Sequence, residues 1–217
     1  MVKRSEPLRG SINKRDAWVW RGNESGMFST ASCRTWMSMG RIQTSSKSIS
    51  WLKWVPPNVL CFIWKLDLGR IPVARNLIVR GVQDIPISCS LCAREPEDID
   101  HLFIRCPTAE EIWRRVSWWA NINLYQAKSV GDLMLIQQNN RLTKMQLKST
   151  TLIIYTTIWL LWKNRNSWIF EKRRFSVINM LEKIKTQAFV WVKNRGAKVI
   201  VDWEKWSSCP LNAITSL

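Results

Sequence analysis

Four potential metal ligands lie within eighteen residues near the middle of this chain. They form the array C-x2-C-x8-H-x4-C through Cys89, Cys92, His101 and Cys106. Thiolates and imidazole are ligands that tetrahedral Zn2+ prefers, and four protein ligands leave no open coordination position. His101 is the one histidine of the chain, and it lies where the fourth ligand is needed. The array therefore predicts one structural zinc ion.

The remaining cysteines, Cys33, Cys61 and Cys209, are scattered singly. They do not resemble a disulfide framework, so we expect a reducing, intracellular compartment, either nucleus or cytoplasm. No charged start leads into an apolar segment of the secretory type. Because free cysteine behaves as a small hydrophobic residue, we expect Cys61 to lie in the core. A nucleophilic pair of Cys106 and His101 is formally an alternative, which the two further thiols at ligand spacing disfavour.

The chain of 217 residues carries a formal net charge of +17. Net charge is +6 for residues 1–50 (nine basic against three acidic), +1 for 51–140 (ten against nine) and +10 for 141–217 (fourteen against four). A basic excess at both ends is typical of proteins that contact phosphate backbones. A basic, solvated face without a nucleic-acid partner is the alternative.

Residues 1–47 are expected to contain a flexible lead, a small β-hairpin and a short helix. Two apolar, strand-like runs, 17–20 and 27–30, flank a turn-rich loop. The short helix is expected over 32–39, ended by Gly40.

Residues 48–120 are expected to form a helical zinc-binding domain. Pro56-Pro57 predicts a helix over 58–66 that is buried on nearly every side, and Pro72 predicts another over 73–80, ended by Gly81. After the ligands, Thr108 and Glu111 have the spacing of a capping box that begins the next helix.

Residues 121–217 are expected to form a basic, Trp-rich helical region, and the fold class is mainly α. Helices are predicted after Ser129, over 143–170 and over 176–194. The apolar run 152–162 has eleven residues, and a membrane span needs about 20, so it predicts a buried helix. Tryptophans at helical spacing among aliphatic residues favour a core role over base stacking.

The middle segment resembles a known family. Its residues are similar to the zinc-binding domain that follows the reverse transcriptase in plant LINE-type (non-LTR) retrotransposons. The resemblance is carried by Trp54, Pro56, Phe62, Trp64, Arg70-Ile71-Pro72, Leu77, Arg80-Gly81, Cys89, Cys92, Glu97, His101-Leu102-Phe103, Cys106 and Trp113. The run Trp162-Lys163-Asn164-Arg165-Asn166 and Phe170 resemble the helical tail that often follows this domain. Asn58 and Val73 depart from residues usual in the family, and neither is a ligand.

The resemblance implies a noncatalytic module of a larger RNA-directed DNA polymerase polyprotein, as a fragment or remnant. Polymerases need paired aspartates to hold Mg2+, and this chain has no Asp-Asp dipeptide. After residue 140 the carboxylates are Glu171, Glu182, Asp202 and Glu204, in contexts that do not support a ribonuclease H. We therefore expect no enzyme, no membrane and no small-molecule substrate. Expected partners are RNA or DNA, and reverse transcriptase or other retroelement proteins. A zinc-stabilised protein-interaction domain is the alternative, and a decayed reading frame without a role is a third.

Charge within the array indicates where phosphate would bind. Between Cys92 and His101, Arg94 stands against four carboxylates, a net charge of −3. This loop should repel phosphate, so we expect it to fix the helix ending at Arg80 against the helix beginning at Thr108. Nucleic-acid contacts are assigned instead to Arg80, Arg114, Arg115, Lys163, Arg165, Lys172, Arg173 and Arg174.

Overall fold

A computed structural model describes residues 19–20, 24–27, 29, 32, 49–136, 141–173, 176–197 and 199–216. The chain divides into two compact units, Met1–Thr44 and Ser45–Leu217. The predicted domain boundaries at residues 47 and 120 stay predictions.

In the first unit, the described residues form part of a turn. The amide of Trp20 donates a hydrogen bond to the carbonyl oxygen of Gly26 at 2.8 Å, and Gly26 has a φ of +70°. Neither Trp20 nor Gly26 is in a strand, and Ser32 is helical. The rest of the predicted hairpin and of the helix over 32–39, together with the predicted flexible lead, lies outside the described residues.

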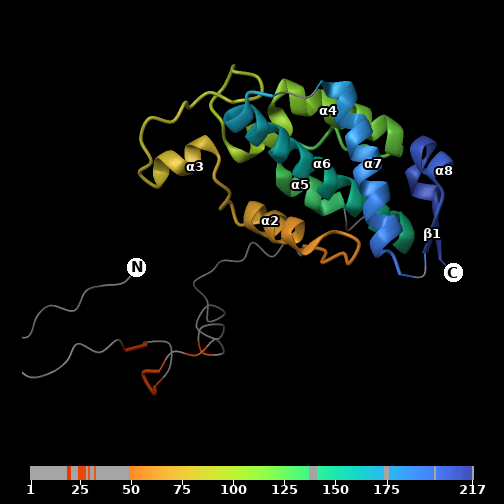
Figure 1. Ribbon diagram of the computed structural model, residues 1–217, viewed down its shortest axis with the longest axis horizontal. Coiled ribbons are helices and arrows are strands. Elements are labelled where there is room, and N and C mark those ends of the chain that lie inside the picture. The colour runs from red at the N-terminus through yellow and green to blue at the C-terminus, as the bar shows by residue number, and fades with distance from the viewer. Residues whose placement is uncertain are drawn as a thin grey trace, which may run out of the picture. The chain divides into compact units, whose positions relative to one another are not determined.

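The second unit is mainly helical, as predicted (Figure 1). The helix bounds agree with the sequence prediction to within a few residues. They are α2 (Pro57–Asp67), α3 (Ala74–Val79), α4 (Pro107–Ala120), α5 (Val130–Leu135), α6 (Lys144–Glu171) and α7 (Val177–Arg195).

Several of these helices begin at a side chain that satisfies the first free backbone amides. Ser129 with Asp132 and Thr143 with Gln146 form complete capping boxes at α5 and α6, and the Ser176 hydroxyl accepts from the Asn179 amide at α7. The capping box predicted for Thr108 and Glu111 was wrong. Helix α4 begins one residue earlier, at Pro107, because proline suits the first position of a helix, and Cys106 is its N-cap residue.

A small antiparallel sheet lies at the C-terminal end of the described chain, and not at the N-terminal end where a hairpin was expected. Strands β1 (Val199–Val201) and β2 (Ile214–Ser216) pair with Ile200 opposite Thr215. Between them lie α8 (Trp203–Ser208) and a 3-10 turn (Pro210–Asn212). Strands of three residues are too short to show a period of two, so the sequence pattern did not reveal them.

Helix α6 runs through the core and contacts both α2 and α7. Its segment 152–158 is buried on every side, which confirms the predicted buried helix. The hydroxyls of Thr156 and Thr157 donate to the carbonyls of Leu152 and Ile153 at 2.7 and 2.8 Å, so burial leaves neither of them unsatisfied. No helix in the described part of the chain is long and apolar enough to cross a membrane.

Phe62 on α2 packs between α6 and Phe103, whose ring centroid lies 6.4 Å from its own. Its ring centroid lies 5.3 Å from that of Trp159 and 5.5 Å from that of Trp162. The neighbouring Cys61 is exposed, so the prediction that it lies in the core was wrong. Helix α2 buries Phe62 and Ile63 but leaves Cys61 and Trp64 facing solvent.

We predict that Phe62→Ala lowers the free energy of unfolding by about 3–5 kcal/mol, because it leaves a cavity between α2 and α6. Chemical denaturation followed by circular dichroism measures this change. The matched control is Cys61→Ala on the exposed face, with an expected change within about 0.5 kcal/mol. Equal losses in the two variants would contradict this packing.

Candidate metal centre

The four predicted ligands come from three neighbouring pieces of backbone. Cys89 and Cys92 lie in the loop after α3, residues 80–100, which we call the zinc loop. His101 begins a π-helical turn, η1 (His101–Arg105), and Cys106 stands at the start of α4. The loop folds back on itself, because the Cys89 amide donates to the Glu95 carbonyl and the Ala93 amide donates to the Cys89 carbonyl, both at 2.7 Å. This tight turn brings Cys89 and Cys92 to the same side.

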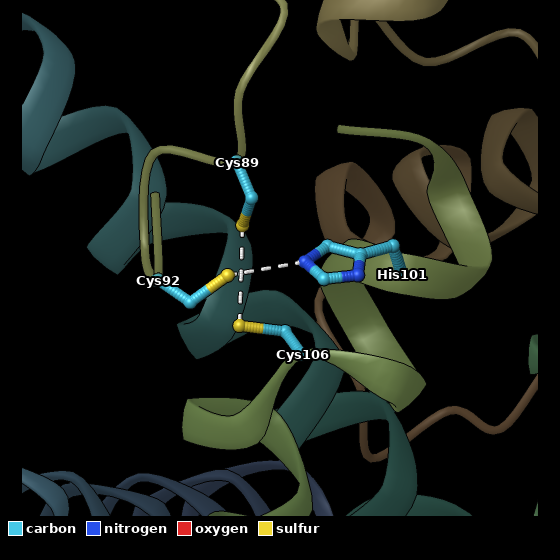
Figure 2. Close-up of side chains that lie close together, drawn as sticks. All are labelled: Cys89, Cys92, His101 and Cys106. Carbon is cyan, nitrogen blue, oxygen red and sulfur yellow. Dashed lines mark hydrogen bonds between the residues drawn. The ribbon is translucent and has the colours of Figure 1, made fainter. Parts of the chain in front are cut away.

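The side chains of the four residues point toward one common centre (Figure 2). Their ligand atoms all lie within 4.8 Å of one another. The sulfurs of Cys89 and Cys106 are 3.9 Å apart, and the sulfur of Cys92 is 3.3 Å from Nε2 of His101. Two sulfurs bound tetrahedrally to zinc at about 2.3 Å would be separated by about 3.8 Å, whereas a disulfide requires about 2.05 Å. The geometry therefore fits one four-coordinate zinc ion.

The electrostatics of the site favour a thiolate at Cys106. A hydrogen bond from the Cys89 thiol lowers the pKa of Cys106 to about 5, opposed by burial and assisted by the amides of Ala109 and Thr108 in the first turn of α4. The same hydrogen bond and burial raise the pKa of Cys89. Zinc binds thiolates, so one ligand is already in the form that the metal needs.

Glu95 orients the histidine ligand. Its Oε2 lies 3.1 Å from Nδ1 of His101, on the side of the ring opposite the nitrogen that faces Cys92. A carboxylate on the second nitrogen fixes the ring orientation and makes the first nitrogen a better ligand. Sequence reasoning counted Glu95 as loop charge and missed this role, although an acidic residue within the ligand array was a signal for it.

Two further carboxylates of the loop also have structural partners. Asp98 accepts from the His101 amide at 2.7 Å and from the Arg105 guanidinium at 3.0 Å. Asp100 accepts from the Val130 amide at 2.9 Å and so connects the loop to the start of α5. These carboxylates hold the loop in shape around its ligands.

Glu97 is almost completely buried, with 1% of its surface exposed, and ties three elements together. It accepts hydrogen bonds from the Ala74 amide at 3.1 Å, the Ser90 hydroxyl at 2.9 Å and the Arg165 guanidinium at 2.6 Å. Burial raises the pKa of Glu97, but the hydrogen bonds and positive charge of Arg165 outweigh it, so the pKa lies below its usual value. The ionised carboxylate connects α3, the zinc loop and α6.

Comparison with known proteins agrees with this geometry. Residues 28–113 match the family model described as zinc-binding in reverse transcriptase. This segment is a reverse-transcriptase zinc-binding domain. The match begins upstream of residue 48, in the segment that we expected ahead of the domain. The chain has no match among the curated proteins or the solved structures.

Around this zinc-binding domain, the residues assigned to nucleic-acid contact have different surroundings. Arg165 is buried and ion-paired with Glu97, so we withdraw it as a phosphate contact. Lys163 and Arg165 are two residues apart on α6 and lie on different sides of it, with Lys163 exposed and Arg165 buried. Arg80 donates to the Arg70 carbonyl at 2.8 Å. Arg114 and Arg115 both pair with Glu111, and Lys163, Lys172 and Arg173 are exposed, with Arg173 3.5 Å from Glu171. Arg174 lies outside the described residues.

Elemental analysis of the protein should find about one zinc ion per chain, lost in Cys92→Ser.

Glu95→Gln should retain zinc but bind it about 10- to 100-fold more weakly, because the His101 ring loses its charged partner. Competition with a chromophoric chelator measures the affinity, which should fall as pH is lowered, since protons compete for the thiolates. A folded, metal-free wild-type protein would contradict the assignment.

Glu97→Gln should lower the free energy of unfolding by about 3–5 kcal/mol, because it leaves the Arg165 charge buried without a counter-ion. Denaturation of the zinc-loaded protein measures the loss. Glu111→Gln is the control, since it also removes a carboxylate with two arginine partners but on an exposed helix face, where ion pairs contribute little. An equal loss of unfolding free energy in the two variants would show that the buried Glu97–Arg165 pair contributes no more than an exposed ion pair.

Proposed function

We propose that this chain is a noncatalytic, zinc-stabilised module that helps hold RNA or DNA. In this proposal it is a fragment or remnant of the RNA-directed DNA polymerase polyprotein of a plant LINE-type retrotransposon, acting in the nucleus or cytoplasm. The family match to residues 28–113 and the net charge of +17 support it. The zinc ion has a structural part, because all four positions around it are filled by side chains.

The observation that carries the proposal is the separation of charge within the second unit. The zinc-loop carboxylates contact groups of the protein itself, whereas Lys163 and Lys183 line an open groove of about 660 Å³ between α6 and α7, together with Glu171 and Glu182. Desolvation and the nearby charge of Lys163 lower the pKa of Lys183, so the two ammonium groups repel each other across this groove. Its carboxylates have cationic partners, Glu182 with Lys185 at 3.0 Å and Glu171 with Arg173 at 3.5 Å. Lys163 and Lys183 are the cations that a phosphodiester backbone entering this groove would meet.

A second candidate function, a protein-interaction domain, is favoured by exposed apolar side chains between α3 and the zinc loop. Val79 is 81% exposed and Ile87 is 57% exposed. Large apolar side chains that gather on a surface mark docking sites for other proteins. Recovery of one defined partner after nuclease treatment, without any affinity for nucleic acid, would select this candidate.

The nucleic-acid proposal predicts binding that weakens steeply with salt through counterion release. In fluorescence anisotropy with a labelled oligonucleotide, Lys163→Gln with Lys183→Gln should weaken binding and lower the salt slope by about one for each phosphate that the variant no longer neutralises. Arg114→Gln with Arg115→Gln should also weaken binding, without releasing zinc. Lys65→Gln with Lys128→Gln, which removes two exposed lysines elsewhere on the chain, is the control for net charge. Wild-type affinity no better than that of a neutral protein at low salt would overturn the proposal.

A further inference from the structure

A second groove, of about 560 Å³, lies between the zinc loop and the C-terminal end of α6. It is distinct from the α6–α7 groove, because its walls are the segment 84–90 on one side and the segment 168–172 on the other. The buried pair of Glu97 and Arg165 also lines it and holds the two walls together. Cys89 is a further lining residue, so one wall is shaped by a metal ligand.

The wall formed by α6 presents aromatic rings. Phe170 is 78% exposed, although exposing a ring of this size forgoes roughly 1.5–3 kcal/mol of burial. Trp168 is also in the lining, with Nζ of Lys172 5.8 Å from its ring centroid. Exposed aromatic rings next to cations are the arrangement on which proteins stack the bases of single strands.

Charge around the groove favours a nucleotide over an apolar peptide. Glu97 with Arg165 and Glu171 with Arg173 are matched ion pairs. Beyond them, Asp84 lines one wall and Lys172 the other, and the exposed Arg94 follows the lining residue Ala93. An apolar peptide would cover Lys172 without supplying an anion, which is costly. A nucleotide supplies both a flat ring for Phe170 and a phosphate for Lys172.

The opposite wall adds polar groups. Ser88 and Asp84 lie along the zinc-loop side of the lining, where a hydroxyl and a carboxylate can hydrogen-bond to the edge of a base. Sequence reasoning favoured a core role for the tryptophans at helical spacing and made no such prediction for Phe170, which is exposed at the last turn of α6.

We propose that this groove binds a nucleobase of single-stranded RNA or DNA, with Phe170 stacking on the base and Lys172 contacting the neighbouring phosphate. This inference rests on the proposed nucleic-acid function and adds a site that reads unpaired bases. Zinc binding would also support nucleic-acid binding, because metal ligands lie in the loop that forms one wall of the groove.

The test uses the zinc-loaded full chain and two labelled oligothymidylates of equal length, one intact and one with abasic sites. Phe170→Ala should weaken binding of the intact strand by about 5- to 150-fold, the range for loss of one base stack. The same variant should bind the abasic strand as the wild type does. Phe170→Leu should behave like Phe170→Ala, because leucine keeps an apolar surface but has no ring. Tyr125→Ala is the control, since Tyr125 is an aromatic residue that is 53% exposed in the loop between α4 and α5 and lines neither groove.

Each outcome decides the proposal. Weaker binding of the intact strand only, together with no change in Tyr125→Ala, supports it. Wild-type affinity in Phe170→Ala, or an equal loss with both strands, overturns the base-stacking proposal. In that case, salt-dependent binding by the wild type would still support the proposed nucleic-acid function. Full binding by Phe170→Leu overturns stacking and indicates an apolar contact. If the wild type binds neither strand, both proposals fail together.

Discussion

The ion pair between Glu97 and Arg165 is the interaction on which the second unit depends. Moving two charges out of water is costly, and their attraction repays this cost only when the remaining hydrogen-bonding groups are also satisfied. Here Glu97 also accepts from the Ala74 amide and the Ser90 hydroxyl, so its carboxylate is saturated. The pair joins residues 68 positions apart in the chain. Because the zinc loop supplies one partner and α6 the other, the metal site and the long helix form one folded body.

The acidic residues between Cys92 and His101 have structural roles that their charge alone did not indicate. A net charge of −3 made it a poor site for phosphate, and the structure gives no reason to change that. The reason for the charge is structural, because Glu95 orients His101, Asp98 holds the π-helical turn and Asp100 reaches the start of α5. Ligands within a stretch of eighteen residues need such partners, since zinc alone fixes their sulfur and nitrogen atoms but not the backbone between them.

Local signals made much of this fold predictable, and long-range contacts account for what was missed. The ligand array, Pro57, Ser129 and Thr143 act through neighbours in the chain, so sequence spacing located the metal centre and the helix starts. The pairing of Val199–Val201 with Ile214–Ser216 and the burial of Arg165 depend on how distant segments meet. Cys61 shows the same limit, because an apolar helix that packs on one side must expose the other, and composition does not say which side that is.

A structural zinc site with an acidic loop is compatible with nucleic-acid binding if the metal and the phosphates bind at different surfaces of the protein. Zinc with three thiolates carries a net charge of −1, so contact between this centre and a phosphate is unfavourable at short range. The zinc loop instead positions a wall opposite Phe170, while Lys163 and Lys183 face an open groove on another side of α6. Helix α6 is common to both grooves and to the buried ion pair. In the proposed arrangement a change at Glu97 would reach both grooves through α6, without altering Lys163, Lys183 or Phe170.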